Sequence, residues 1–336
     1  MPRKSKCVIP WTAAGWLAVL LLVVSTPAFS YIDSPKTACP HGEKGPEESC
    51  IKADKPYMTK EFTLDGTGIL KLFTLAGNIQ VISVPDSRKV TVELYVDRGY
   101  AIWSNAKNID NYRIIMLQRG NEIISSVEKK KRDTGFFSDK MSFSYKVYTP
   151  TSISTQLKTL AGKIEVNDLR GDHLIKSSGG KIQLTSMTGH IQTYTSGGSI
   201  EIQQCKGTVF ARTDGGSIYI DDSAGELRLK SMGGNIISER TSGTFLAQVN
   251  GGDIKVQMIS VNNGVNLETT AGDIYLELPR SGTFDLIAHG TSIHLERRNL
   301  FKGEYSKQYI NGTLNGGGKP VNIETASGTI TINLPQ

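Results

Sequence analysis

Apolar and polar residues alternate along most of the chain from about residue 60, with the period of two that is typical of β-strands. From residue 160 a G-G-x-I or A-G-x-I signature recurs every eighteen residues. Its last glycines are Gly162, Gly180, Gly198, Gly216, Gly234 and Gly252. A second glycine stands nine residues before each of the later five. The pattern predicts a coil of eighteen residues in which strand and turn alternate twice.

Equivalent positions of successive coils carry similar apolar residues. One such column contains Ile182, Ile200, Ile218, Ile236 and Ile254. Strands stack about 4.8 Å apart, so each coil would bury the inner face of its neighbour. The sequence therefore predicts an all-β protein, a parallel β-solenoid with two-sided 18-residue coils. We expect the glycines to occupy turns of positive φ where a side chain would clash with the next coil.

The period is less regular towards both ends. Residues 74–81 nearly duplicate residues 159–166, which predicts that the first coil begins near residue 60. Alternating runs between the two copies predict a β-meander inserted in, or capping, the first coils. Residues 297–309 interrupt the period, and residues 316–332 are expected to form a final coil or cap that protects the open end from edge pairing.

The first thirty residues combine a basic start, an apolar run at 13–24 and the small residues Ala28 and Ser30, as in a secretory signal peptide. We predict cleavage after Ser30 and export to the periplasm, cell envelope or extracellular space; an uncleaved N-terminal anchor is the alternative. Without residues 1–30 the formal net charge falls from +6 to +3. This small excess disfavours a nucleic-acid-binding protein.

Export also bears on the cysteines. Residues 31–58 form a proline-containing linker in which Cys39 and Cys50 are predicted to form a disulfide, with free thiols as the alternative. Cys205 falls on an inward column, which predicts a buried, inert thiol. The expected organisation is a signal peptide (1–30), this linker, a first coil with the β-meander (59–150) and a β-solenoid with a C-terminal cap (151–336).

The glycine ladder, the A-G-N-I-Q-V of residues 76–81 and the N-G-G-G-K-P-V-N-I-E-T-A-S-G-T-I-T-I of residues 315–332 resemble the bacterial "putative adhesin" or toastrack family of β-strand-repeat proteins. The resemblance spans about residues 60–335. It implies a β-solenoid of the cell envelope or surface, with no agreed biochemical activity and no defined catalytic residues.

Patterns that would indicate catalysis or metal binding are sparse. Calcium-binding β-rolls need G-G-x-G-x-D turns, whereas isoleucine replaces the third glycine here. The five histidines show no metal-ligand spacing, so neither a metal nor a cofactor is expected. A carbohydrate-active lyase or hydrolase on the same fold is the alternative function. Its nearest candidate carboxylates are Asp214, Asp221, Asp222 and Glu239, but their neighbours at the same offset, Thr185, Gln203 and Gln257, favour a solvated outer column.

One outward column combines basic and aromatic residues. It contains Lys176, Tyr194, Arg212 and Lys230, flanked by Phe210 and Arg228. Cations interleaved with aromatic rings are typical of surfaces that bind anionic glycans, so we predict an envelope polysaccharide as the ligand. The alternative is a face that only keeps the protein soluble.

A second surface feature is a basic and aromatic loop, formed by Lys129, Lys130, Lys131, Arg132, Phe136 and Phe137. Such a loop could contact anionic lipid or another envelope protein; a solvated hairpin with buried phenylalanines is the alternative. The sequence thus predicts an exported, non-catalytic envelope scaffold or adhesin-like binding module that does not bind nucleic acid. It leaves the oligomeric state open.

Overall fold

A computed structural model describes residues 55–97, 109–130 and 141–335, which belong to one compact unit, Glu48–Gln336. These residues form β-strands and two 3-10 helices, η1 (Ile109–Asn111) and η2 (Arg298–Leu300), and the expected all-β class is confirmed. None of the helices in this part of the chain is long and apolar enough to span a membrane. The predicted signal peptide, Cys39 and Cys50 lie outside the described residues.

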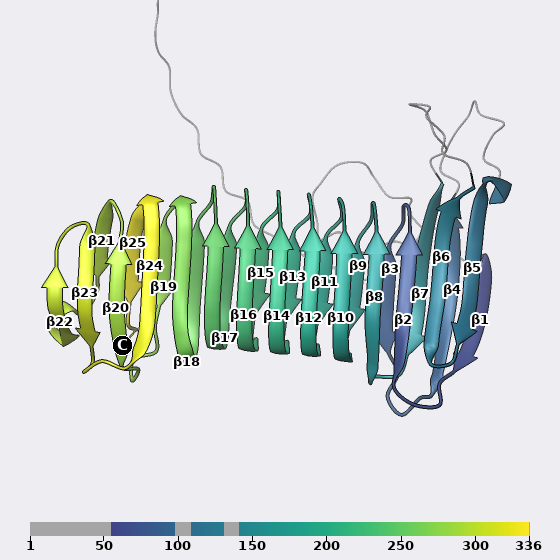
Figure 1. Ribbon diagram of the computed structural model, residues 1–336, viewed down its shortest axis with the longest axis horizontal. Coiled ribbons are helices and arrows are strands. Elements are labelled where there is room, and N and C mark those ends of the chain that lie inside the picture. The colour runs from purple at the N-terminus through teal and green to yellow at the C-terminus, as the bar shows by residue number, and fades with distance from the viewer. Residues whose placement is uncertain (1–54, 98–108, 131–140, 336) are drawn as a thin grey trace, which may run out of the picture. The chain divides into compact units, whose positions relative to one another are not determined.

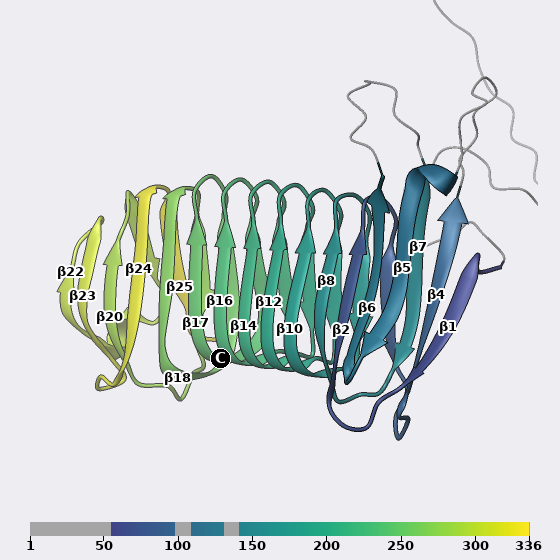
Figure 2. The same ribbon diagram turned by 45° about the vertical axis from the view of Figure 1, so that its right-hand side comes forward.

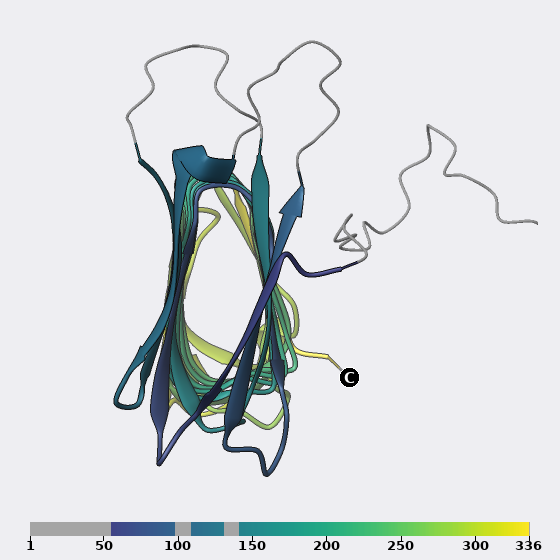
Figure 3. The same cartoon turned by 90° about the vertical axis from the view of Figure 1, so that its right-hand side faces the viewer.

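The strands form two layers, here called face A and face B (Figures 1 and 3). In spatial order, face A contains β5 (Tyr112–Arg119), β6 (Glu122–Lys129), β2 (Gly68–Thr74), β8 (Ile153–Thr159), β10 (Arg170–Ser177), β12 (Thr188–Thr195), β14 (Lys206–Thr213), β16 (Ala224–Ser231), the second halves of β17 (Ile236–Val249) and β18 (Ile254–Ala271), β24 (Lys319–Ser327), β20 (Phe284–His289), β23 (Tyr309–Leu314) and β22 (Phe301–Tyr305).

Face B contains, in the same direction, β1 (Met58–Thr63), β4 (Lys89–Asp97), β7 (Ser142–Thr149), β3 (Ile79–Ser83), β9 (Ile164–Asn167), β11 (Ile182–Thr185), β13 (Ile200–Gln203), β15 (Ile218–Asp221), the first halves of β17 and β18, β19 (Ile274–Glu277), β25 (Thr329–Asn333) and β21 (Ser292–Leu295). Strands of adjacent coils are parallel through the middle of the stack, and antiparallel strands occur at its ends.

Residues eighteen apart lie beside one another in the middle of the stack. On face B, Ile182, Ile200 and Ile218 occupy equivalent positions of β11, β13 and β15, and all three are fully buried. On face A, Ile191 and Val209 pair in the same way. The inward side chains of both faces belong to one hydrophobic cluster. Each coil is therefore stabilised by burial against its neighbours rather than by a core of its own.

The glycine of each G-G-x-I turn is required by close contact with the preceding coil. A Cβ atom on Gly198 would lie closer than 3.0 Å to the carbonyl oxygen of Gly180. Gly189, in the middle of a coil, combines such a clash with a φ of 124°. The expectation of positive φ is therefore correct for the mid-coil glycines. It is wrong for Gly198, which is not among the residues with a positive φ.

A row of buried hydroxyl groups joins the ends of β10, β12, β14 and β16 to the turns that follow. The Thr195 hydroxyl donates a hydrogen bond to the carbonyl of Gly180 (3.1 Å) and accepts one from the N–H of Gly198 (3.2 Å). Thr213 makes the equivalent bonds to Gly198 and Gly216. These hydroxyls satisfy backbone groups of the turns that the inter-coil ladder leaves unpaired.

At both ends of the stack, the spatial order of the coils differs from their order in the sequence. β2 and β3 lie between the β6/β7 coil and the β8/β9 coil. β24 and β25 lie between β18/β19 and the β20/β21 coil. The expectation that residues 316–332 form the last coil or a cap is therefore wrong: they form an inner coil, with strand partners on both sides. The cap comes instead from β22 and β23, which extend face A antiparallel beyond β20.

Strands of the predicted meander region, together with β1, which precedes that region, cover the other end of the stack, as Figure 2 shows. β4 and β1 add antiparallel strands to β7 on face B, and β5 adds one to β6 on face A. Lys60 on β1 donates a hydrogen bond from Nζ to the carbonyl of Met116 on β5 (2.8 Å). An inward-pointing charge on a terminal strand disfavours pairing with another chain.

Candidate functional site

The predicted basic and aromatic column lies on the outward side of face A. Lys176, Tyr194, Arg212 and Lys230 occupy the same position of β10, β12, β14 and β16 and neighbour one another in that order. Phe210 and Arg228 lie side by side two residues earlier on β14 and β16. The structure thus brings all six predicted residues together on one face.

The column continues further than predicted. Lys158 on β8 lies beside Lys176, and Phe73 on β2 lies beside Lys158. The sequence signal for Lys158 was the period of eighteen, and the signal for Phe73 was the duplication of residues 74–81 and 159–166, which aligns Phe73 with Lys158. We call the row Phe73, Lys158, Lys176, Tyr194, Arg212 and Lys230 the basic strip.

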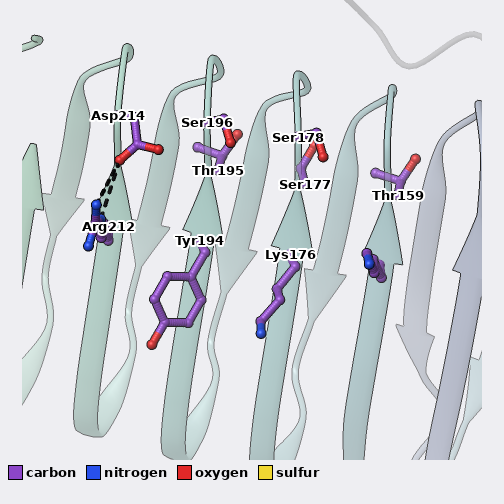
Figure 4. A pocket seen from close by; sticks show the side chains of 10 residues that line it. Thr159, Lys176, Ser177, Ser178, Tyr194, Thr195, Ser196, Arg212 and Asp214 are labelled. Carbon is purple, nitrogen blue, oxygen red and sulfur yellow. Dashed lines mark hydrogen bonds and ion pairs between the residues drawn. The ribbon is translucent and has the colours of Figure 1, made fainter. Parts of the chain in front are cut away.

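Aromatic rings hold two of its ammonium groups against the face. Lys158 Nζ lies 5.6 Å from the centre of the Phe73 ring, and Lys176 Nζ lies 5.4 Å from that of Tyr194. The rings of Tyr194 and Phe210 lie 5.4 Å apart. Both distances to the ammonium groups are within the range of cation–π attraction. The cations are thus positioned along the strand surface, as Figure 4 shows for Lys176.

The positive charges of the strip differ in their partners. Arg212 forms an ion pair with Asp214 on its own strand end at 3.1 Å, and Arg228 forms one with Glu226. Within the described residues, Lys158, Lys176 and Lys230 form no ion pair with a carboxylate. These three lysines therefore supply the charge that remains available to a ligand.

Two hollows follow the basic strip. One of about 320 Å³ places turn residues beside the cations (Figure 4): its lining includes Lys158, Lys176, Tyr194, Arg212, Ser178, Ser196 and Asp214. The other, of about 210 Å³, is lined in part by Phe210, Arg228, Lys230 and Gln248. Ammonium groups, exposed hydroxyls and aromatic rings along one line can contact acidic groups, hydroxyls and ring faces of a single extended ligand.

The positive charge covers only part of face A. Beyond Lys230 the same column continues as Gln248, Glu268 and Glu324 on β17, β18 and β24. The side-chain amide of Gln248 donates to Glu268 at 3.1 Å. An anionic ligand is therefore attracted over β8 to β16 and repelled beyond them.

The carboxylates of the enzymatic alternative do not converge as a group. Asp221 and Glu239 are neighbours on face B and line a hollow of about 360 Å³ with Tyr219. Asp221 forms an ion pair with Arg240. Asp214 directly follows β14 of face A, and Asp222 occupies a turn at a φ of 45°. Among the described residues, no group of three His, Cys, Asp or Glu side chains could hold a metal ion.

Two other reactive residue types are buried in the core. Cys205 is fully buried, as its column predicts, and burial raises the pKa of its thiol to about 11, which keeps the reactive thiolate scarce. His173 is 2% exposed, and its Nδ1 lies 3.0 Å from the Thr155 hydroxyl. Burial lowers the pKa of His173 to about 4, so its imidazole is neutral near pH 7.

The second predicted surface feature lies mostly outside the described residues. Lys129 ends β6 and Lys130 follows it. Lys131, Arg132, Phe136 and Phe137 lie in the part of the chain that is not described. The lipid-binding or partner-binding role of this loop stays a prediction.

The stacked, in-register strands define the chain as a β-solenoid-like protein. It matches the family model of the Toastrack DUF4097 proteins over residues 79–333, and the chain belongs to this family. The resemblance recognised in the sequence is thereby confirmed.

Solved structures with similarity to the chain come from several bacteria. A "putative adhesin" from Bacteroides fragilis is 13% identical with a TM-score of 0.34, over 84% of this chain and 98% of that chain. A "putative cell adhesion protein" from Clostridium sporogenes is 14% identical with a TM-score of 0.22, over 84% and 100%. A "putative lipid binding protein" from Parabacteroides distasonis is 10% identical with a TM-score of 0.31, over 83% and 98%. No curated protein matches the chain.

Proposed function

We propose that the protein is an exported, non-catalytic binding module of the cell envelope, and that the basic strip binds a linear anionic polysaccharide. The observation that carries this proposal is the row of Lys158, Lys176 and Lys230, which have no carboxylate partners among the described residues, on one exposed face with Tyr194 and Phe210 between them. The signal-peptide pattern of residues 1–30 supports export.

The spacing of the cations favours a ligand that lies across the strands. Lys158 and Lys230 are four strands apart, which at about 4.8 Å per strand separates them by about 19 Å. The ammonium groups would bind acidic substituents along the polymer, and the Tyr194 and Phe210 rings would pack against sugar rings. Each exposed contact contributes less than about 1 kcal/mol, so binding depends on several contacts made by one chain.

The test compares charge removal on the two faces. The strip variant replaces Lys158, Lys176 and Lys230 with Gln. The matched control replaces with Gln the two lysines that directly precede β9 and β11, Lys163 and Lys181, and Lys255 on the face B half of β18, and therefore has the same net charge. We expect the strip variant to bind heparin about 10- to 100-fold more weakly at low ionic strength, while the control binds as the wild type does.

Two results contradict the proposal. Equal weakening in both variants would mean that net charge alone determines retention. Unchanged heparin binding by the strip variant would mean that the three lysines do not contribute to the site. Thermal unfolding of both variants, compared with that of the wild type, checks that neither result comes from loss of structure.

A carbohydrate-active lyase or hydrolase is the second candidate, favoured by the neighbouring carboxylates of Asp221 and Glu239 in one hollow. Incubation of the protein with envelope polysaccharides distinguishes the two functions. Shortened chains that disappear with Asp221→Asn or Glu239→Gln would favour the enzyme. Saturable retention without any product favours the binding module.

A further inference from the structure

An apolar patch occupies the outward side of face A at the end nearest the meander strands. Its members are all exposed or half-buried: Ile69, Phe73, Ile115, Leu117, Ile124 and Leu174. Phe73, Ile124 and Leu174 line one hollow of about 310 Å³. Strand register places Leu117 on β5 beside Ile124 on β6, so the apolar surface continues to the terminal strand of the face. A hollow lined by apolar side chains with a few polar groups is typical of ligand-binding sites.

Three lysines line the same hollow: Lys71, Lys158 and Lys176. Lys71 forms an ion pair with Glu122, so its charge is compensated. Lys158 and Lys176 have no such partner within the described residues and lie on the side of the hollow that faces the basic strip. The hollow is therefore apolar over most of its lining and positively charged along one border.

We propose that this hollow binds an anionic amphiphile, with its acyl chain on the apolar patch and its acidic headgroup at Lys158 and Lys176. The charge complementarity at the border selects an acidic headgroup, and the patch provides the aliphatic contact. The site shares Phe73 and these two lysines with the basic strip, but Ile124 and Leu174 are not part of the proposed polysaccharide site. Either proposal can therefore fail while the other holds.

The experiment uses alkyl phosphates of increasing chain length, from hexyl to decyl, below their critical micelle concentrations and measured by calorimetry. We expect the affinity of the wild type to rise about two- to fourfold with each added methylene group, because each buries apolar surface. The decyl glucoside, which has no charge, should bind at least about tenfold more weakly than decyl phosphate.

A patch variant, Ile124→Ser with Leu174→Ser, changes two residues that line the hollow and should lose most of the dependence on chain length while binding heparin as the wild type does. The matched control replaces Ile259 and Ile287, which are 56% and 40% exposed and lie on β18 and β20, with Ser. This control should keep the dependence on chain length. Lys158→Gln with Lys176→Gln should weaken decyl phosphate binding about tenfold or more and leave the methylene dependence in place.

The proposal is overturned if chain length has no effect on the wild type, or if the patch variant and the control behave alike. Equal binding of the glucoside and the phosphate would contradict the role of the two lysines. The wild-type series and the lysine variant do not depend on the fold of the patch variant. If the lysine variant binds heparin as the wild type does while the patch variant loses decyl phosphate binding, only the polysaccharide proposal fails.

Discussion

Face A and face B are built by the same coil but differ in what they present outside. Through the middle of the stack, each coil places eight residues on face A, as in β10, and four on face B, as in β11. Both faces bury aliphatic columns inside. Outside, face A carries the basic strip, whereas Lys163 and Lys181, which directly precede face B strands, form ion pairs with Glu165 and Glu201. The repeat fixes the inward positions of both faces, and the outward positions are free to differ between them.

The largest expected loss of stability comes from a substitution that disrupts the contact between successive coils, on which both faces depend. Gly198→Ala should destabilise the protein by about 3 kcal/mol or more, because its Cβ would clash with the backbone of Gly180. Gly197→Ala is the matched control, since the nearest atoms to its Cβ lie 3.9 Å away. Denaturant unfolding measures both. Similar losses at the two glycines would contradict the role of inter-coil contact.

Acid should destabilise the protein through a buried histidine on the inner side of face A, whereas face B has no such group at the neighbouring inner positions. Burial lowers the pKa of His173, on the inner side of face A, from 6.5 to about 4, whereas the neighbouring inner positions of face B, Ile164 and Ile182, do not titrate. The unfolded chain therefore binds more protons between these pH values, and stability that is present above pH 6.5 is lost as the pH falls to about 4, by about 3 kcal/mol.

Unfolding free energies of the wild type and His173→Leu across this pH range check the assignment. The variant should show a flatter pH dependence than the wild type. An identical slope in both proteins would attribute the acid sensitivity to other groups.

A smaller effect is expected from the hydroxyl row at the ends of the face A strands. Thr195→Val should cost about 1 to 2 kcal/mol, because the carbonyl of Gly180 and the N–H of Gly198 lose their hydrogen-bond partner. Thr185→Val, at a half-buried outward position of face B, serves as the control and should change stability by less than about 0.5 kcal/mol. Calorimetric melting of both variants measures the difference.

The smallest effect on stability should come from Asp214→Asn, which removes an exposed ion pair with Arg212 and should cost less than about 0.5 kcal/mol. It should also strengthen heparin binding a few-fold, because Arg212 becomes available to the ligand. Asp221→Asn, which releases Arg240 on face B, should leave heparin binding unchanged. Equal strengthening by both substitutions would contradict the assignment of the site to face A.

The coils could be predicted because each one repeats the same local requirements. The spacing of eighteen residues is enough to predict an isoleucine column such as Ile182, Ile200 and Ile218, and the structure places these residues in register. The order of the coils at the ends could not be predicted in this way. The alternation of apolar and polar residues in 319–327 indicates a strand but does not predict that its neighbours are β18 and β20.

The candidate site was predicted in part for the same reason. Lys176, Tyr194, Arg212 and Lys230 follow the regular period, so their alignment could be read from spacing alone. Lys158 follows it too, but Phe73 reaches the strip only because β2 is inserted next to β8. The apolar patch depends on the same insertion and on the pairing of β5 with β6, which residue spacing does not express.

The most direct test of the central claim is a structure of the protein with a bound anionic oligosaccharide. We expect the ligand to cross β8 to β16 on face A, with its acidic groups beside Lys158, Lys176 and Lys230. A ligand held on face B, or on face A beyond β17 next to Glu268, would contradict it.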